Sequence, residues 1–212
     1  MVYFTTFDIN YYFNKMSKAD LTRQLIIEKT ATLFNKKGFA GTSLSDITDA
    51  TGLTKGSIYG NFENKEEVAL AVFKHNAGEL WKKKEHWIAG YSDAKSKLAA
   101  LIDFYRKNWK ELFENGGCPV MNAATDADDV MPLMKQRVKK TVDNWVSNVA
   151  KILEEGIEQN TFKPTINSAE YSRLFIMMIE GGILLSKISD KPDSLYLALE
   201  RIEKIISEEI LI

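Results

Sequence analysis

Two short amphipathic helices, joined by a single glycine, are encoded within residues 43–62. Ser43 and Asp46 have the spacing of a capping box, in which each side chain accepts a hydrogen bond from the other residue's backbone N–H. Gly52 suits the left-handed backbone that ends the first helix, and Thr54 is a preferred residue for capping the second. This pattern predicts a helix, a tight turn and a second helix that pack together as one unit.

The second of these helices is predicted to be apolar on one side and polar on the other. Ile58 and Phe62 are about one turn apart and are expected to face the core. The outward-facing residues of this segment are expected to be Lys55, Gly56, Ser57, Tyr59 and Asn61. A short helix with a polar outer face, held by a glycine turn, has the shape that a DNA major groove accepts. The pattern therefore indicates a DNA-binding helix-turn-helix.

The rest of the chain is predicted to be helical as well. Apolar residues recur at helical spacing, and the only breaks are short segments rich in Gly, Asn, Asp and Pro. Besides the two short helices we expect seven others, at about 21–37, 64–87, 93–114, 119–126, 132–159, 168–188 and 194–212. With 12 Gly and 4 Pro in 212 residues, and without any extended strand pattern, the chain is predicted to be all-α with about nine helices.

We expect two domains after an N-terminal extension. Residues 17–65 form a three-helix domain that contains the helix-turn-helix, and residues 66–212 form a larger helical domain. Residues 1–16 lack the basic and apolar regions of a signal peptide. Because Met16 is followed directly by a helix start, this segment is either the product of an upstream start codon or a genuine N-terminal arm.

The charge of the chain is distributed unevenly. The net charge is −1, but residues 17–65 contain seven Lys and Arg against five acids, whereas residues 66–212 contain 20 against 23. The sign of this asymmetry suits a DNA-binding N-terminal domain, and its small size implies a few well-placed phosphate contacts instead of a broad basic field. The longest apolar runs are too short to span a membrane, and the single Cys118 suits a reducing compartment. We therefore expect a cytoplasmic protein.

Residues Thr22 to Val72 resemble the DNA-binding domain of the TetR/AcrR family of bacterial regulators. The matching positions follow one another in order through the helix-turn-helix and beyond; they are Ala31, Leu33, Phe34, Gly38, Phe39, Thr42, Ser43, Asp46, Ile47, Ala50, Gly52, Leu53, residues 54–59, Phe62, Lys65 and Glu66. The remaining residues agree with the family only in length and helical character. Family members carry a three-helix DNA-binding domain followed by a helical domain for ligand binding and dimerisation.

The resemblance implies a set of DNA contacts. Thr42 and Ser43 match positions that touch the phosphate backbone, and Lys65 matches a phosphate-binding lysine. The residues that match the recognition helix are Thr54, Lys55, Gly56, Ser57, Tyr59 and Asn61. The chain departs from the family at Gly60, where an aromatic residue is common, and at Asn61, where histidine is common. These departures remove one backbone contact and leave the operator sequence open.

The resemblance also implies a cavity for a small molecule in the C-terminal domain. Met and aromatic side chains suit an adaptable apolar pocket, although such side chains ordinarily form core. The residues we expect to line the cavity are Trp109, Phe113, Met134, Trp145, Phe175 and Met178.

The last two helices are expected to form the dimer interface. Each has a broad apolar stripe, and Gly181 and Gly182 would let a neighbouring backbone approach closely. We reason that two such helices cannot both bury their stripes within one small subunit, so they should pair with a second copy as a four-helix bundle. The interface residues we predict are Phe175, Ile179, Ile183, Leu195, Leu199, Ile202 and Ile206.

Other functions find little support in the residues. We identify no nucleophile and base pair, no phosphate-binding loop and no pair of catalytic carboxylates, so we expect no enzyme and no cofactor. His75 and His86 lack companion ligands, and no metal site is predicted. Cys118 precedes a helix that begins at Pro119, so it is either a thiol sensor activated by the helix N-terminus or a buried residue without chemistry.

The leading hypothesis is a homodimeric transcriptional regulator, usually a repressor in this family. It would bind a palindromic double-stranded operator and leave it when an effector, whose identity the sequence does not give, fills the C-terminal cavity. The alternative is a helical ligand-binding or adaptor protein whose DNA site has decayed, because Gly60 and the weak positive charge depart from a strong DNA site. We expect no membrane partner.

Overall fold

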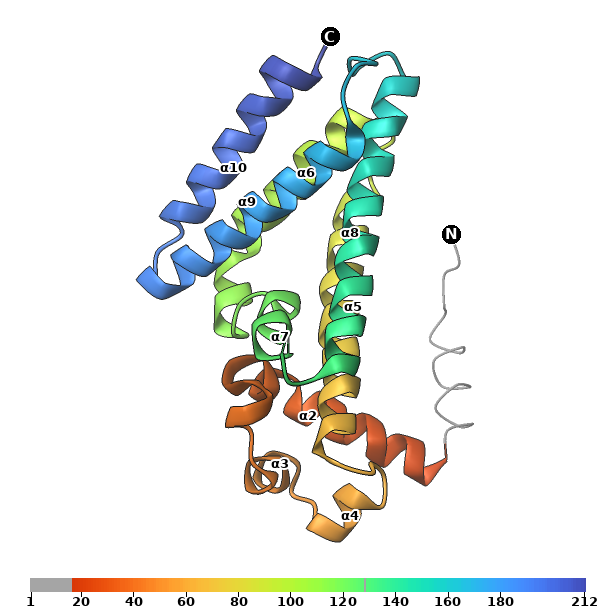
Figure 1. Cartoon of the computed structure of the whole chain (residues 1–212), viewed down its shortest axis with the longest axis vertical. Helices are drawn as coiled ribbons and strands as arrows, with labels where there is room; N and C mark the ends of the chain where they lie inside the picture. The colour runs from red at the N-terminus through yellow and green to blue at the C-terminus, as the bar shows by residue number, and fades with distance from the viewer. Residues whose placement is uncertain (1–16, 128) are drawn as a thin grey trace. The chain divides into compact units, whose positions relative to one another are not determined.

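The computed structural model describes residues 17–127 and 129–212, and these residues are helical almost throughout (Figure 1). Within them lie nine α-helices, α2 to α10, and one turn of π-helix, so the predicted all-α class is confirmed. The prediction for residues 1–16 lies outside the described residues. The chain divides into two compact units, one that ends at His75 and one that begins at Asn76. This division falls inside α5, whereas the boundary predicted from the sequence follows residue 65.

The first unit consists of three helices and the beginning of a fourth; these are α2 (Lys18–Gly41), α3 (Leu44–Thr51), α4 (Lys55–Tyr59) and α5 (Lys65–Ile88). Each helix contributes apolar side chains to one core, whose buried members include Ile26, Phe34, Ile47, Ile58, Phe62, Val68 and Val72. Because α4 is only five residues long, its position depends on this shared core more than on its own hydrogen bonds.

Gly38 interrupts α2 where the sequence predicts a helix end. Its φ is +70°, a left-handed conformation that glycine adopts without strain. One further turn follows and ends at Gly41, so α2 is longer than predicted. At its other end, Ser17 and Asp20 form a capping box.

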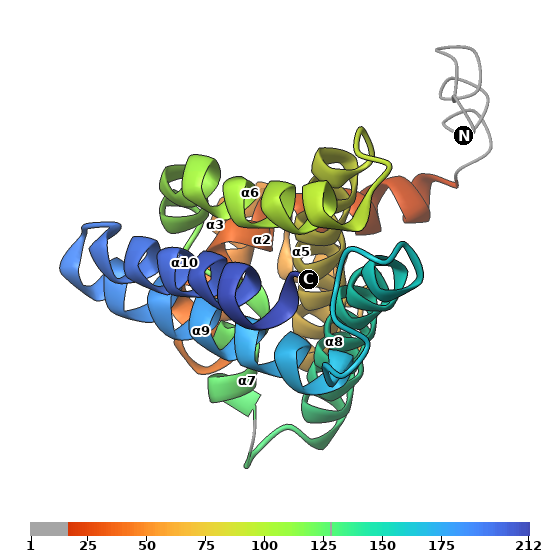
Figure 2. The same ribbon diagram turned by 90° about the horizontal axis from the view of Figure 1, so that it is seen from above.

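The second unit contains the end of α5 and all later elements (Figures 1 and 2). Their bounds are α6 (Ala94–Glu114), α7 (Pro119–Ala127), α8 (Pro132–Glu158), α9 (Ser168–Ser189), α10 (Asp193–Ile205) and the π-helical turn η1 (Ile206–Ile210). The last helix is predicted to continue to residue 212, but the chain leaves the helix after Ile210. Ile212 donates a backbone hydrogen bond to Thr161 instead.

The α9 and α10 helices lie side by side and approach each other closely (Figure 2). A Cβ atom at Gly182 would lie 2.9 Å from the Cα of Leu195, so only glycine fits there. The backbone N–H of Leu195 also donates to the buried hydroxyl of Ser186, at 2.7 Å. The predicted backbone approach is thus confirmed at Gly182, where the neighbour is α10 of the same chain. Gly181 faces open space.

The prediction of the dimer interface is wrong for the residues it names. All seven are buried within a single chain, with exposures between 0% and 8%; they are Phe175, Ile179, Ile183, Leu195, Leu199, Ile202 and Ile206. The α9 and α10 helices bury these stripes against each other and against α6 and α8. The same two helices expose a different set of apolar side chains, namely Met177, Leu184, Leu185, Ile188 and Leu197.

None of the helices in the described part of the chain combines the length and the apolar character needed to cross a bilayer.

Candidate nucleic-acid interface and internal cavity

The α3 helix, the turn and α4 have the local geometry that the sequence predicts. The Ser43 hydroxyl accepts from the backbone N–H of Asp46, and the Asp46 carboxylate accepts from that of Ser43, at 2.8 Å. Gly52 is left-handed, with a φ of +71°. The Thr54 hydroxyl caps α4 by accepting from the backbone N–H of Ser57. These three local features hold α3, the turn and α4 in the predicted arrangement, so the predicted helix-turn-helix is confirmed.

Asp46 also ties α3 to α2. Its carboxylate lies 2.7 Å from the ammonium group of Lys37. This contact, together with the hydrogen bonds from Ser43, holds the pKa of Asp46 well below its usual range. The carboxylate is therefore ionised at neutral pH and suits the N-terminal end of α3, where the helix dipole favours negative charge.

The outer face of α4 is exposed while its inner face is buried. Ile58 and Phe62 are almost fully covered, as predicted. Lys55 and Gly56 are exposed, and Tyr59 keeps 46% of its surface exposed, which is high for a large aromatic side chain. A tyrosine of this exposure has both a ring face and a hydroxyl available to a partner.

Asn61 is held by its own segment. Its side-chain amide donates to the backbone carbonyl of Ser57, at 2.8 Å. Both residues are half-buried. This bond closes the end of α4 and occupies one of the two amide hydrogens that Asn61 has for base contacts.

Arg23 fixes the segment that follows α4, and the sequence analysis did not identify it. Its guanidinium group donates to the backbone carbonyl of Asn61 and to the Glu67 carboxylate, at 2.6 Å, and lies 3.9 Å from the ring centre of Phe62. One side chain from α2 thus joins the end of α4 to the start of α5. A single arginine in the first helix is too common to have indicated this role.

Lys65 has a structural role in addition to the predicted DNA contact. Its ammonium group donates to the backbone carbonyls of Phe39 and Thr42, at 2.8 and 2.9 Å, and lies over the Phe39 ring. An ammonium group has three donors, so one is left for a phosphate. Thr42 itself is fully buried, and its hydroxyl donates to the carbonyl of Gly38. The predicted phosphate contact is therefore wrong for the Thr42 side chain.

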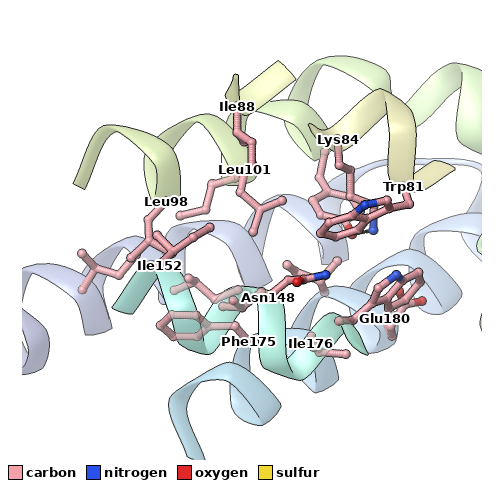
Figure 3. A pocket seen from close by; sticks show the side chains of 17 residues that line it. Trp81, Lys84, Ile88, Leu98, Leu101, Asn148, Ile152, Phe175, Ile176 and Glu180 are labelled. Carbon is pink, nitrogen blue, oxygen red and sulfur yellow. Dashed lines mark hydrogen bonds between the residues drawn. The ribbon is translucent and has the colours of Figure 1, made fainter. Parts of the chain in front are cut away.

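The second unit contains a cavity lined mainly by apolar side chains of α5, α6, α8, α9, α10 and η1 (Figure 3). The volume open to the centre of a water-sized sphere is about 50 Å³, several times the roughly 10–15 Å³ that one water molecule needs. Leu98, Leu101 and Ile152 lie toward one end of the cavity, and Lys84 and Glu180 lie toward the other (Figure 3). The cavity is therefore amphipathic.

Two of the six predicted cavity residues, Trp145 and Phe175, line the cavity. Trp109 and Phe113 stack edge to face on each other, at 5.4 Å between ring centres, and do not line it. The remaining two, Met134 and Met178, lie outside the lining as well. These four residues do not line this cavity, because a helical pattern shows that a side chain faces inward but not which space it reaches.

A cluster of buried polar groups lies at the polar end of the cavity. The Lys84 ammonium group donates to the Tyr105 hydroxyl at 2.7 Å and lies 4.0 Å from the Trp145 ring centre. The Cys118 thiol and the Glu180 carboxyl group belong to the same cluster and interact electrostatically. Only 4% of Lys84 and 6% of Glu180 are exposed. One sequence signal was available for this cluster, because Glu180 is an acid within the most apolar helix.

Burial dominates the electrostatics of this cluster. It lowers the pKa of Lys84, raises that of Glu180, and raises those of Tyr105 and Cys118 well above their usual values. The nearby Glu180 carboxylate raises the pKa of the Cys118 thiol further. A thiol in this environment stays protonated and unreactive, which favours the interpretation of Cys118 as a residue without redox chemistry.

The described residues provide no group of three or more His, Cys, Asp or Glu side chains that could hold a metal ion.

Two protein-family models match the chain. The model described as "Bacterial regulatory proteins, tetR family" matches residues 26–72, which include α3 and α4. The model described as "Tetracyclin repressor-like, C-terminal domain" matches residues 94–202, which include most of the second unit.

Individual proteins agree with these matches. The chain is similar to the crystal structure of a TetR-family transcriptional regulator from Cytophaga hutchinsonii, with 37% identity, a TM-score of 0.89, and coverage of 93% of this chain and 98% of the other. A TetR transcriptional regulator from Chloroflexus aurantiacus is 31% identical, with a TM-score of 0.85 and coverage of 93% and 100%.

A third similar protein is the HTH-type transcriptional repressor DhaR from Mycobacterium sp. (strain GP1), which is 24% identical over 166 residues, or 78% of this chain and 82% of the other. The helix-turn-helix geometry and these matches along both units lead to one conclusion: the chain belongs to the TetR family of bacterial helix-turn-helix transcriptional regulators.

Proposed function

We propose that the chain is a homodimeric repressor that binds a palindromic operator and is released when a small molecule enters the cavity of its second unit. The observation that carries the proposal is the exposed polar face of α4 on a rigidly capped helix-turn-helix. The similarity to a protein named as a transcriptional repressor supports the direction of regulation. The amphipathic cavity supports the existence of an effector.

The residues proposed to contact DNA differ in how exposed their side chains are. Ser43, Thr54, Lys55, Gly56 and Tyr59 are exposed and are proposed to contact phosphates or base edges directly. The half-buried Ser57, Asn61 and Lys65 are proposed to contribute fewer contacts. The Asn61 amide and the Lys65 ammonium group already donate to partners within the unit, and the Ser57 side chain is partly covered. A set this small matches the modest positive charge of the first unit and predicts a shallow salt dependence of affinity.

Dimerisation is proposed to use the outer face of α9. Met177, Leu184 and Ile188 follow one another at helical spacing and lie more than half exposed, at 64%, 56% and 74%. Leu185 on α9 and Leu197 on α10 extend the same apolar character. A contiguous exposed apolar face of this kind marks an interaction site. In a two-fold dimer it would hold two copies of α4 about 34–36 Å apart, the spacing of successive major grooves.

Release by the effector is proposed to be a population shift. A compound that binds the cavity in one arrangement of the two units would favour that arrangement over the one that fits two successive grooves. Thermodynamic linkage then requires the operator to weaken compound binding by the same factor by which the compound weakens operator binding.

The proposal is tested by selecting operator DNA from fragmented genomic DNA with the purified protein. The affinity of the selected duplex is then measured by fluorescence anisotropy with and without compounds that raise the melting temperature. A compound that fills the cavity should raise the melting temperature in proportion to its occupancy and should weaken operator binding. Failure to select any sequence above background would favour the alternative of a ligand-binding protein with a decayed DNA site. Stabilisation by compounds without any loss of operator affinity would refute the release mechanism.

A further inference from the structure

One carboxylate oxygen at the polar end of the cavity lacks a partner. Glu180 is 6% exposed, and its Oε2 atom is buried without a hydrogen-bond partner. Buried carboxylate oxygens ordinarily accept hydrogen bonds, and leaving one unpaired destabilises the fold. Because Glu180 lines the cavity (Figure 3), the missing donor can come from a molecule bound there.

The charge of the cavity limits what that molecule can be. Its lining contains one basic group, Lys84, and one acidic group, Glu180, so the two together have no net charge. The Lys84 ammonium group is already placed against the Tyr105 hydroxyl and the Trp145 ring. An ionic ligand would leave one buried charge unbalanced in this apolar space, which is strongly unfavourable. An uncharged ligand adds no such penalty.

The shape of the lining limits the rest of the ligand. Leu98, Leu101 and Ile152 lie away from the polar end (Figure 3). They would bury an aliphatic or aromatic body while its head reaches Glu180. A ligand with a single polar group at one end therefore matches the cavity, and a ligand with polar groups at both ends does not.

We propose that the cavity takes an uncharged apolar compound whose one polar head, a hydroxyl or an amide N–H, donates a hydrogen bond to Oε2 of Glu180. This inference rests on the proposed function and identifies the chemical class of its effector. Burial raises the pKa of Glu180 and lowers that of Lys84, and the pair has no net charge whether both groups are ionised or both are neutral.

The test uses four probes of matched size on the intact protein: 1-hexanol, its isomer butyl ethyl ether, hexylammonium and hexanoate. Binding is measured by isothermal titration calorimetry and by the emission of the tryptophans, two of which, Trp81 and Trp145, line the cavity. We expect 1-hexanol to bind tightest. It should exceed the ether by roughly tenfold or more, because the ether has no hydrogen to donate to Oε2 of Glu180.

Variants show whether Glu180 causes this preference. Glu180→Met keeps the length of the side chain but has no oxygen, and it should reduce the preference for 1-hexanol over the ether to about twofold or less. Glu180→Gln keeps an oxygen acceptor, so this variant should retain most of the preference for 1-hexanol over the ether. Ile152→Val shortens the apolar end and should weaken both probes equally.

The outcomes separate this inference from the proposed function. Equal binding of 1-hexanol and the ether by the wild-type protein would overturn the role of Glu180 but leave a ligand-binding cavity. Tightest binding of hexylammonium or hexanoate would overturn the uncharged class. If none of the four probes binds, both the inference and the effector part of the proposed function fail. The wild-type series decides the matter even if the Glu180 variants do not fold.

Discussion

Replacing Arg23 with alanine should loosen α4 without removing any side chain that we propose to touch DNA. Arg23 donates to the carbonyl of Asn61 and to the Glu67 carboxylate and lies over the Phe62 ring. A hydrogen bond from a charged donor contributes about 1.5 kcal/mol, at the low end of its range. The ion pair is about a third exposed on both sides, so it adds only about 0.5 kcal/mol. The cation–π contact adds roughly another 0.5 kcal/mol.

These contributions together stabilise the junction of α4 and α5 by about 2–2.5 kcal/mol, which corresponds to a change in local opening of roughly thirtyfold or more. Hydrogen exchange followed by mass spectrometry measures this directly. In Arg23→Ala, peptides that cover residues 57–67 should exchange that much faster, while peptides from α8 should not change.

Two further variants serve as controls for this experiment. Arg23→Lys keeps the charge but not the planar fork, so it should give an intermediate loss of protection. Lys29→Ala removes an exposed charge from the same helix and should change exchange by about twofold at most. If Arg23→Ala leaves peptides 57–67 protected to within about twofold, the reasoning that Arg23 anchors α4 is refuted.

Three other predictions follow from the second unit. Gly182→Ala should destabilise the protein to urea by about 1–3 kcal/mol, because its Cβ would meet the α10 backbone at 2.9 Å; the control Gly78→Ala, which faces open space on α5, should stabilise it by up to about 1 kcal/mol. Leu184→Glu should shift the protein from dimer to monomer in analytical sedimentation. The control Leu133→Glu changes a similarly exposed leucine on α8 and should leave the dimer intact. Equal behaviour of the two variants would exclude the proposed α9 interface. Cys118 should react with a thiol reagent only after unfolding, since burial raises its pKa, and rapid reaction of the native protein would contradict this.

The helix-turn-helix was predictable from the sequence because its determinants are local. A capping box, a left-handed glycine and a threonine cap act within a few residues of one another, and each is found where it is predicted. The long-range hydrogen bonds that hold α4 and the start of α5 in place were not predictable, because Arg23 and Lys65 bond to residues that are distant in the sequence. Nothing in their sequence context distinguishes them from solvated charges.

The error in the dimer interface has a specific physical cause. The α9 helix has apolar side chains on two sides, one that includes Ile179 and Ile183 and another that includes Leu184 and Ile188. Helical periodicity identifies both stripes, but it does not say which one the subunit buries. The structure buries the first stripe against α8 and α10 and leaves the second exposed.

The polar end of the cavity was missed for a related reason. Lys84 is the last of three consecutive lysines. Its position around the axis of α5 places it in the interior, whereas Lys82 is exposed. Its partners Tyr105 and Trp145 come from α6 and α8. A cluster assembled from separate helices leaves no spacing pattern in the sequence.

The most direct test of the DNA-binding function is the affinity of a selected operator duplex for the double variant Lys55→Ala, Tyr59→Ala. Both side chains are exposed on α4, so their removal should leave the fold intact, as judged by circular dichroism, and weaken operator binding by roughly a hundredfold or more. Removal of Lys55 should also reduce the slope of affinity against salt by about one phosphate contact. The control Lys151→Ala, an exposed lysine on α8, should bind as the wild type does. A folded double variant that retains wild-type affinity and salt dependence would contradict the assignment of α4 as the recognition helix.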